Sequence, residues 1–291
     1  MLQPELLLDG GAVLGEGPAW DMVKKQLYWV DIRAGDLHIY HPEIGTDIRV
    51  PLGEKVGCVA PCKSGDLVIA LRGTIATLNL QTQKLTRLVT LEEHLPGNRF
   101  NDGKCDPAGR FLAGTMDHAE EEASGSLYSY SSSGILQTLM TGIRISNGIT
   151  WSPDHKIFYH IDTPSRQITA FDYDLASGEI HQPRPIITVP PEIGWPDGMT
   201  SDSRGNLWVA MWGGAKITRW NPITGDLMES IPVPAFNVTS CIFGGEDLTD
   251  LYITSARKGL SREQATKFPL SGGLFRIKTN IQGMQTFAFA G

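Results

Sequence analysis

The chain lacks the features that would direct its 291 residues to a membrane, a nucleic acid or a secretory route. No apolar run is long enough to span a bilayer, and no basic segment followed by an apolar one opens the sequence, as in secretory signals. Lysine and arginine form no dense cluster, and the formal net charge is −7, which disfavours nucleic-acid binding. We therefore expect a cytoplasmic protein with neither a membrane nor a nucleic acid as its partner.

Cysteine is also scarce, with only Cys58, Cys62, Cys105 and Cys241. Structural zinc sites need a second ligand pair at matching spacing, and none is present. Cys58 and Cys62 would share one face of an extended segment but lie too far apart for easy bridging. The sequence thus predicts buried free thiols. A convincing amphipathic helix is missing as well, with at best one helical turn at 263–268.

The chain does contain a sixfold repeat of short apolar segments, namely LYWVDI, LVIALR, FLAGTM, IFYHID, LWVAMW and LYITSA, which begin at 27, 67, 111, 157, 207 and 251. A short strand and a polar turn precede each segment, and a turn and another strand follow it. Several strands in a unit of about forty to fifty residues are typical of a β-propeller blade. The pattern predicts an all-β protein with one domain, residues 1–291, built as a six-bladed β-propeller around a central channel.

Two further expectations concern how the ring is built. Two stacked β-domains would need a linker, and the only candidate is the proline-rich stretch 182–196. Its place in the repeat makes it a connection between blades instead. We also predict that segments 5–10 and 285–291 share one blade, which would join the chain ends and remove an exposed strand edge.

Four polar residues stand ten or eleven positions before their apolar segments: Glu16, Asn101, Asn147 and Asp197. The first strand of each propeller blade lines the channel, so the four side chains should meet at one mouth. Taken singly, Asn-Gly and Asp-Gly are common turn dipeptides, but the shared register favours a site. Oxygen donors favour Ca²⁺, Mg²⁺ or Mn²⁺, and carboxylates also bind Zn²⁺ or Fe²⁺. The pattern predicts a site for one divalent metal ion.

Longer stretches then resemble the signatures of the SMP-30/gluconolactonase family: LGEGPAW, NRFNDGKCDPAGRFLAGTM, SNGITWSPD, PDGMTSDSRGNLWVA and TSCIFGGEDLTDLYITSA. The resemblance covers essentially the whole chain. It implies a six-bladed propeller with one divalent metal ion in its channel and hydrolysis of sugar lactones. It also implies that the metal ligands are Glu16, Asn147 and Asp197, and that Asp197 is the general base.

The same resemblance implies that Arg99 and Asn101 contact the substrate. An acidic residue between GTM and GSLY has that role too, and three neighbours compete for it: Glu120, Glu121 and Glu122. We predict Glu121. Trp195 and Trp212 flank the Asp197 repeat and either wall the pocket or pack in the core. His118 lies in the loop after GTM, within reach of the mouth, whereas His160 within a strand is expected to be structural.

These residues suit the opening of a sugar lactone to an aldonic acid, as with glucono-, xylono-, arabino- or galactonolactone. A divalent cation polarises a carbonyl or lowers the pKa of bound water. Arg99 donates in a planar fork, and Asn101 both donates and accepts, as ring hydroxyls require. The alternatives are a hydrolase of other lactones or phosphotriesters, and a calcium-binding regulatory or interaction propeller without turnover. We expect a monomer or a weak homo-oligomer.

Overall fold

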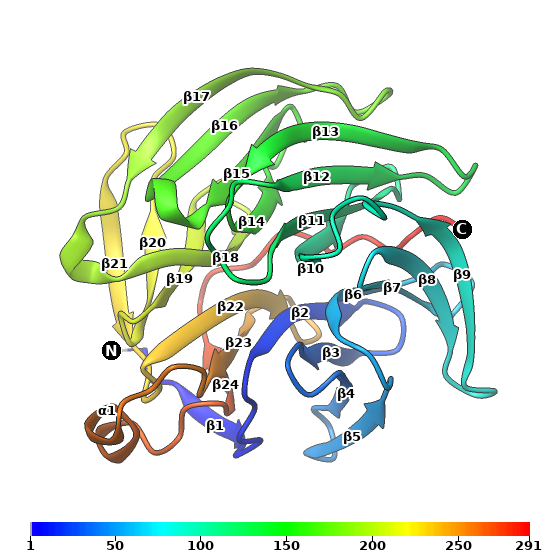
Figure 1. Ribbon diagram of the computed structural model, residues 1–291. Helices are drawn as coiled ribbons and strands as arrows, with labels where there is room; N and C mark the ends of the chain where they lie inside the picture. The colour runs from blue at the N-terminus through cyan, green and yellow to red at the C-terminus, as the bar shows by residue number, and fades with distance from the viewer. Residues whose placement is uncertain (1) are drawn as a thin grey trace.

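Six four-stranded antiparallel sheets surround a central axis in the computed structural model, which describes residues 2–291 (Figure 1). Each of the six apolar segments forms the second strand of a blade. The first strands are innermost, and each contacts the first strands of both neighbouring blades, so the ring is closed. The predicted six-bladed β-propeller is confirmed.

The blades follow the chain order. The first three contain β2 (Gly15–Asp21), β3 (Gln26–Asp31), β4 (Asp36–His41) and β5 (Thr46–Pro51); β6 (Val56–Pro61), β7 (Leu67–Leu71), β8 (Thr74–Asn79) and β9 (Lys84–Thr90); and β10 (Asn98–Cys105), β11 (Phe111–Asp117), β12 (Gly125–Tyr130) and β13 (Leu136–Ile143). The last three contain β14 (Ser146–Trp151), β15 (Ile157–Asp162), β16 (Gln167–Tyr173) and β17 (Ile180–Thr188); β18 (Trp195–Ser201), β19 (Leu207–Trp212), β20 (Lys216–Trp220) and β21 (Leu227–Pro232); and β22 (Asn237–Gly244), β23 (Asp250–Ala256), β24 (Leu274–Lys278) and β1 (Glu5–Leu8).

The helical segments are short. Two 3₁₀ turns, η1 (Thr163–Ser165) and η2 (Pro191–Ile193), and the helix α1 (Arg262–Lys267) lie between strands. Ser261 and Gln264 form a capping box that starts α1. No helix within residues 2–291 is long and apolar enough to cross a membrane.

The proline-rich stretch differs from its prediction. Instead of serving wholly as a connection, its first part belongs to β17, the outermost strand of blade four, and only η2 and its flanks connect the blades. Pro183 and Pro185 lie in this strand. Proline is tolerated there because an edge strand has a side on which no partner requires its missing N–H.

The two ends of the chain close the ring differently from the prediction. β1 pairs with β24 in blade six, so the N-terminal segment does complete the last blade. The expected partner, 285–291, is wrong. That segment runs across the channel end where the inner strands finish: the Phe289 N–H donates to the Pro61 carbonyl at 2.8 Å, and the Ala290 N–H donates to the Gly109 carbonyl at 2.9 Å. The C-terminal segment therefore covers the end opposite the start of the inner strands.

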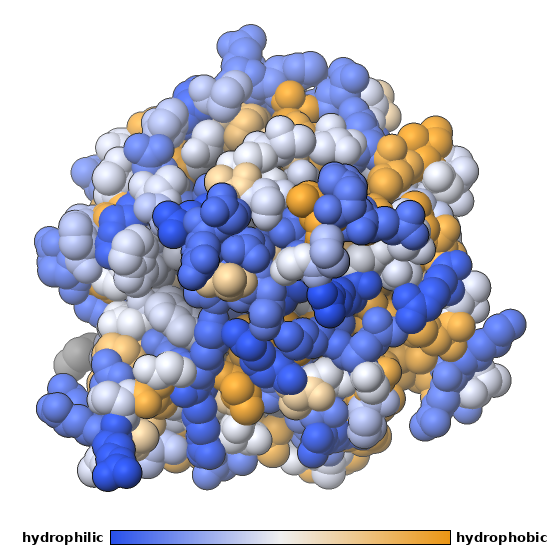
Figure 2. Space-filling model, in the orientation of Figure 1, coloured by the Kyte–Doolittle hydropathy of each residue, from blue (hydrophilic) through white to orange (hydrophobic). Residues whose placement is uncertain are grey.

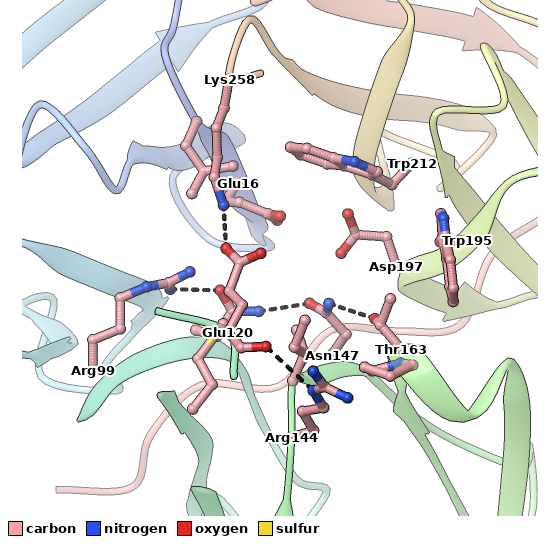
Figure 3. A pocket seen from close by; sticks show the side chains of 15 residues that line it. Glu16, Arg99, Glu120, Arg144, Asn147, Thr163, Trp195, Asp197, Trp212 and Lys258 are labelled. Carbon is pink, nitrogen blue, oxygen red and sulfur yellow. Dashed lines mark hydrogen bonds and ion pairs between the residues drawn. The ribbon is translucent and has the colours of Figure 1, made fainter. Parts of the chain in front are cut away.

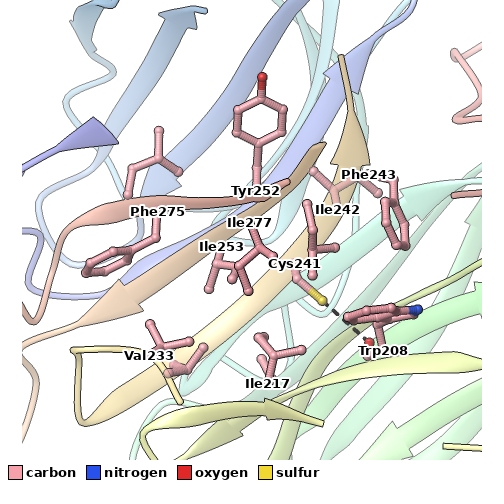
Figure 4. Close-up of a cluster of buried hydrophobic side chains, with 14 of the residues drawn as sticks. Trp208, Ile217, Val233, Cys241, Ile242, Phe243, Tyr252, Ile253, Phe275 and Ile277 are labelled. Atoms are coloured by element: carbon pink, nitrogen blue, oxygen red, sulfur yellow. Dashed lines mark hydrogen bonds between the residues drawn. The ribbon is translucent and has the colours of Figure 1, made fainter. Parts of the chain in front are cut away.

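Apolar side chains fill the spaces between neighbouring blades. Figure 4 shows one such cluster between blades five and six, where Trp208 and Ile217 meet Cys241, Ile253 and other side chains of the last blade. All four cysteines are free and buried, as expected. On the face turned to the viewer, polar residues predominate and apolar ones lie in scattered groups (Figure 2).

A β-bulge or similar irregularity interrupts every inner strand near its start. In β2, β10, β14 and β18 it falls at or directly after the polar residue of the repeat; β6 and β22 carry it at the equivalent place. Glycine follows three of these residues, and at two of the three there is no space for a side chain. A Cβ on Gly148 would lie 2.8 Å from the Asp197 carbonyl oxygen, and one on Gly198 would lie 2.1 Å from Ser240 Oγ. Bulges re-aim side chains, and here they turn polar groups toward the axis.

Phe289→Ala should destabilise the protein by about 3–5 kcal/mol, because Phe289 is 2% exposed and stacks on Tyr130 with ring centroids 6.0 Å apart. Urea unfolding measures the free energy of unfolding, with Val23→Ala at an 89% exposed position as control. Equal stabilities of the two variants would show that the C-terminal segment does not hold the closed end.

Candidate active site

A cavity of about 340 Å³ opens at the mouth where the inner strands begin (Figure 3). Side chains from blades one, three, four, five and six line it. The four polar residues of the repeat all face it, as their shared register predicts: Glu16, Asn101, Asn147 and Asp197. Arg99 lines it as well. The bulged inner strands thus bring together residues that lie up to 181 positions apart in the sequence.

Two carboxylates are buried at the base of this cavity. Glu16 is 5% exposed and Asp197 is 4% exposed. Burial, together with the charge of nearby Asp102, raises the pKa of Glu16 to about 8. Burial and the charges of Glu16 and Asp102 raise the pKa of Asp197 well above its ordinary value. Two such groups ionise together only if positive charge is brought between them.

A chain of hydrogen bonds fixes the amides beside the carboxylates. Arg99 Nη1 donates to Asn101 Oδ1 at 2.6 Å, and Asn101 Nδ2 donates to Asn147 Oδ1 at 2.8 Å. Asn147 Nδ2 then donates to Thr163 Oγ1 at 2.8 Å, and the Thr163 hydroxyl donates to the Pro196 carbonyl at 2.8 Å. Because arginine can only donate, Asn101 Oδ1 is the acceptor, and the bonds that follow determine both amide orientations. This series of hydrogen bonds ends on Pro196, the residue before Asp197.

The donor set fits a hard divalent cation. Asp197 Oδ1 is buried with no hydrogen-bond partner, and the Glu16 carboxylate accepts one bond from the Gly17 N–H at 3.1 Å. Asn147 Oδ1 keeps a lone pair beyond the one that Asn101 uses. Residues 2–291 contain no cluster of three or more His, Cys, Asp or Glu side chains able to hold a metal, so a site here needs the Asn147 amide oxygen. All-oxygen donors of this kind suit Ca²⁺ or Mg²⁺.

Arg99 is held as a buried cation on the other side of the cavity. It is 4% exposed, and burial lowers the pKa of its guanidinium to about 10, so the group stays charged at neutral pH. Its Nη1 also donates to the Phe100 carbonyl at 3.0 Å, whereas its Nε has no partner. Trp195 and Trp212 both line the cavity on the Asp197 side (Figure 3). Of the two roles expected for these indoles, the structure therefore gives them the pocket wall.

The two histidines behave as expected. His160 is buried, with its Nε2 3.0 Å from Ser146 Oγ, and burial lowers its pKa to about 3. His118 lies near the mouth, where Arg33 Nη1 and Lys55 Nζ approach its Nε2 at 3.2 and 3.1 Å. Arginine and lysine only donate, so Nε2 is the acceptor and the ring proton is on Nδ1.

The acidic loop after β11 presents a different residue from the one predicted. Glu120 lines the cavity and forms an ion pair with Lys258, while Glu121 is exposed and its N–H donates to Asp117 Oδ2 at 3.1 Å. The sequence prediction chose Glu121 among three adjacent glutamates. The fold turns Glu120 inward, with a left-handed φ of 67°, so the place expected for Glu121 is taken by Glu120.

Sequence reasoning missed three other polar residues of the pocket, Thr163, Arg144 and Lys258. A signal for two of them was present. Inner strands start at the mouth, so the antiparallel second strands end there, and residues just after the apolar segments also reach the site. Thr163 directly follows IFYHID, and Lys258 is the second residue after LYITSA.

Fold and site together define a six-bladed β-propeller with a pocket of buried carboxylates, amides and basic side chains at one mouth of its channel. The chain belongs to the SMP-30/gluconolactonase/LRE-like family, whose sequence model matches residues 14–257. It is 36% identical over 283 residues to the Bacillus subtilis protein named "Putative sugar lactone lactonase YvrE", covering 97% of each chain. It is 38% identical over 295 residues to regucalcin of Oryctolagus cuniculus, covering 99% of this chain and 98% of the other.

Solved structures of similar proteins share this fold over the whole chain. The luciferin-regenerating enzyme superposes with a TM-score of 0.94 at 31% identity, with complete coverage of both chains. Regucalcin from Agrobacterium tumefaciens, described as a calcium-binding protein, superposes with a TM-score of 0.95 at 28% identity, covering 100% of this chain and 98% of the other.

The rise in Tm on adding Ca²⁺ should be larger near pH 8.5 than near pH 6. The raised pKa of Glu16 means that the metal-free fold loses this group's contribution to stability as pH rises from about 4.5 through about 8. A cation offsets that loss, and it must displace protons at the lower pH. Thermal unfolding with chelator or with CaCl₂ measures both effects. Glu16→Gln should lose most of the pH dependence; an equal Ca²⁺ shift at both pH values in the wild type would contradict the assignment.

Proposed function

We propose that this protein is a divalent-cation-dependent lactonase that opens sugar lactones to aldonic acids. One observation carries the proposal: Asp197, with one carboxylate oxygen that has no hydrogen-bond partner, lines the same cavity as Arg99 and Asn101. A cation-binding scaffold needs the buried oxygens but has no use for a hydroxyl-binding pair beside them. The resemblance to a protein named as a sugar lactone lactonase supports the same conclusion.

In this proposal Glu16, Asn147 and Asp197 would hold the cation, which would supply Lewis-acid polarisation of the lactone carbonyl and charge neutralisation. The Asp197 carboxylate accepts a proton from the attacking water, and the resulting hydroxide adds to the lactone carbonyl carbon. Thr163 acts on the site through Asn147, because its hydroxyl holds the amide nitrogen and turns the amide oxygen toward the cavity. The bond from that carbon to the ring oxygen then breaks, and the leaving alkoxide takes the proton that Asp197 had accepted, which yields the hydroxy acid.

The substrate side of the cavity suits a polyhydroxylated ring. Arg99 and Asn101 are joined by a hydrogen bond and buried, so they present fixed donors and acceptors rather than mobile side chains. Trp212 and Trp195 offer apolar surface to the carbon–hydrogen face of the ring. Glu120, in place of Glu121, accepts hydrogen bonds from substrate hydroxyls.

Two alternatives account for less of the cavity. A phosphotriesterase would need a largely apolar pocket, whereas three acidic and three basic side chains line this one. A calcium-binding protein without turnover is consistent with relatives named regucalcin, but leaves Arg99 and Asn101 unused. Acid release from a panel of aldonolactones, measured by pH-stat after chelation and re-addition of single metals, separates these functions and identifies substrate and metal.

Asp197→Asn should reduce lactone hydrolysis by at least about a thousandfold, because the amide can neither accept the water's proton nor neutralise the cation. Circular dichroism should show an intact fold, since the side chain keeps its shape. Asp226→Asn, at an exposed position in blade five, serves as the matched control. Full turnover by Asp197→Asn would rule out this mechanism.

Glu120→Gln should lower kcat/KM on a neutral aldonolactone by about tenfold, the effect of losing a charged hydrogen-bond partner. Glu121→Gln should stay close to wild type because its side chain is exposed. Steady-state kinetics of both variants distinguish the neighbours. The opposite pattern would restore Glu121 as the substrate contact.

A further inference from the structure

The pocket carries more positive charge than its proposed reaction needs. Three carboxylates line it, Glu16, Glu120 and Asp197, and so do three cations, Arg99, Arg144 and Lys258. A divalent cation held by Glu16 and Asp197 would neutralise both. The remaining lining side chains would then be three cations and a single carboxylate. This excess is unusual in a protein with a formal net charge of −7.

The cations around the mouth also have few partners. Within residues 2–291, neither Arg99 nor Arg144 forms an ion pair, and the same holds for Arg33 and Lys55 beside the pocket. Arg33 and Lys55 share the neutral Nε2 of His118, whose pKa is lowered by burial and by Lys55 and Arg33 themselves. A concentration of unpaired charge of one sign attracts ligands of the other sign.

Lys258 is the one pocket cation with a carboxylate partner, and that partner comes from across the ring. Lys258 follows β23 in blade six, whereas Glu120 belongs to the loop after β11 in blade three, three blades away in either direction (Figure 3). Glu120 is held in a left-handed conformation, which costs a non-glycine residue free energy. Its carbonyl accepts a bond from Arg144 Nε at 3.2 Å. The Lys258 ammonium group at the entrance is therefore paired with a carboxylate of the protein itself.

We propose that the preferred lactone carries an anionic group outside its lactone ring, a carboxylate or a phosphate. Lys258 binds this group in exchange for Glu120. The lactone part of the inference rests on the proposed function. The anion-binding part rests on the charges of the pocket. Lysine presents a compact charge that suits either anion, and Arg144 at the exposed rim would support it.

Calorimetry with three open-chain acids tests this without any turnover. Gluconate has one carboxylate, glucarate has two, and 6-phosphogluconate has a carboxylate and a phosphate; comparison of the last two tells which second anion is preferred. With the protein loaded with Ca²⁺, and again after chelation, the favoured one of the two acids with a second anionic group should bind at least about tenfold more tightly than gluconate. The preference should shrink between about 50 mM and about 500 mM salt, since screening weakens charge attraction.

Variants assign the preference to the pair. Lys258→Met should bring the ratio of the affinity for the favoured acid to the affinity for gluconate close to one. Glu120→Gln should raise this ratio, because the Lys258 ammonium group loses its internal partner. Lys258→Gln is a second variant in case Lys258→Met does not fold. Lys84→Met, on the exposed outer strand of blade two, should keep the wild-type ratio.

Equal affinities for the three acids, or a preference that survives loss of the Lys258 charge, would overturn the inference. The two proposals fail separately. A preference for acids with a second anionic group, without hydrolysis of any lactone, would support the anion site and reject the lactonase. Hydrolysis of lactones without that preference would do the reverse.

Discussion

The close approach of six inner strands to one axis is the constraint on which the site depends. Where the strands start, adjacent backbones come so near that a Cβ on Gly148 or Gly198 would collide with the next blade. The bulges at these points release the strands from regular pairing and turn Asn147 and Asp197 toward the axis. The hydrogen-bond chain from Arg99 to Pro196 then joins three blades, so the ring and the site stabilise the same geometry.

Two buried aspartates show how the protein separates structure from function. Asp202 is fully buried and satisfied: its carboxylate accepts from Trp208 Nε1 at 3.1 Å and forms an ion pair with Arg219 at 2.7 Å. Asp197 lies in β18, five positions before Asp202 in the sequence. It is also buried, but one of its oxygens has no hydrogen-bond partner and a like charge lies nearby. Buried polar groups are normally satisfied, so an unsatisfied carboxylate facing a cavity indicates a site kept for a ligand.

The two walls of the cavity have different origins. The Asp197 side is rigid, because its indoles belong to Trp195 and Trp212, which lie opposite each other in the paired strands β18 and β19. The Arg166 guanidinium carbon also lies 3.5 Å from the centre of the Trp195 ring. The opposite side includes a loop organised by its own hydrogen bonds to Asp117 and tied to the far blade through Glu120 and Lys258. Chemistry placed on strands is held precisely, while a loop can exchange its contacts for those of a ligand.

The sequence by itself determined the number of blades, the place of each apolar segment between two strands of its blade, and the mouth at which Glu16, Asn101, Asn147 and Asp197 meet. Periodic strands and a shared register are local patterns that repeat along the chain, so they can be read without coordinates. Tertiary structure decided the rest. The route of Phe289 depends on which surface has room for its ring, and the choice of Glu120 over Glu121 depends on one backbone conformation. The meeting of Glu120 with Lys258 joins residues 138 positions apart, and only closure of the ring brings them together.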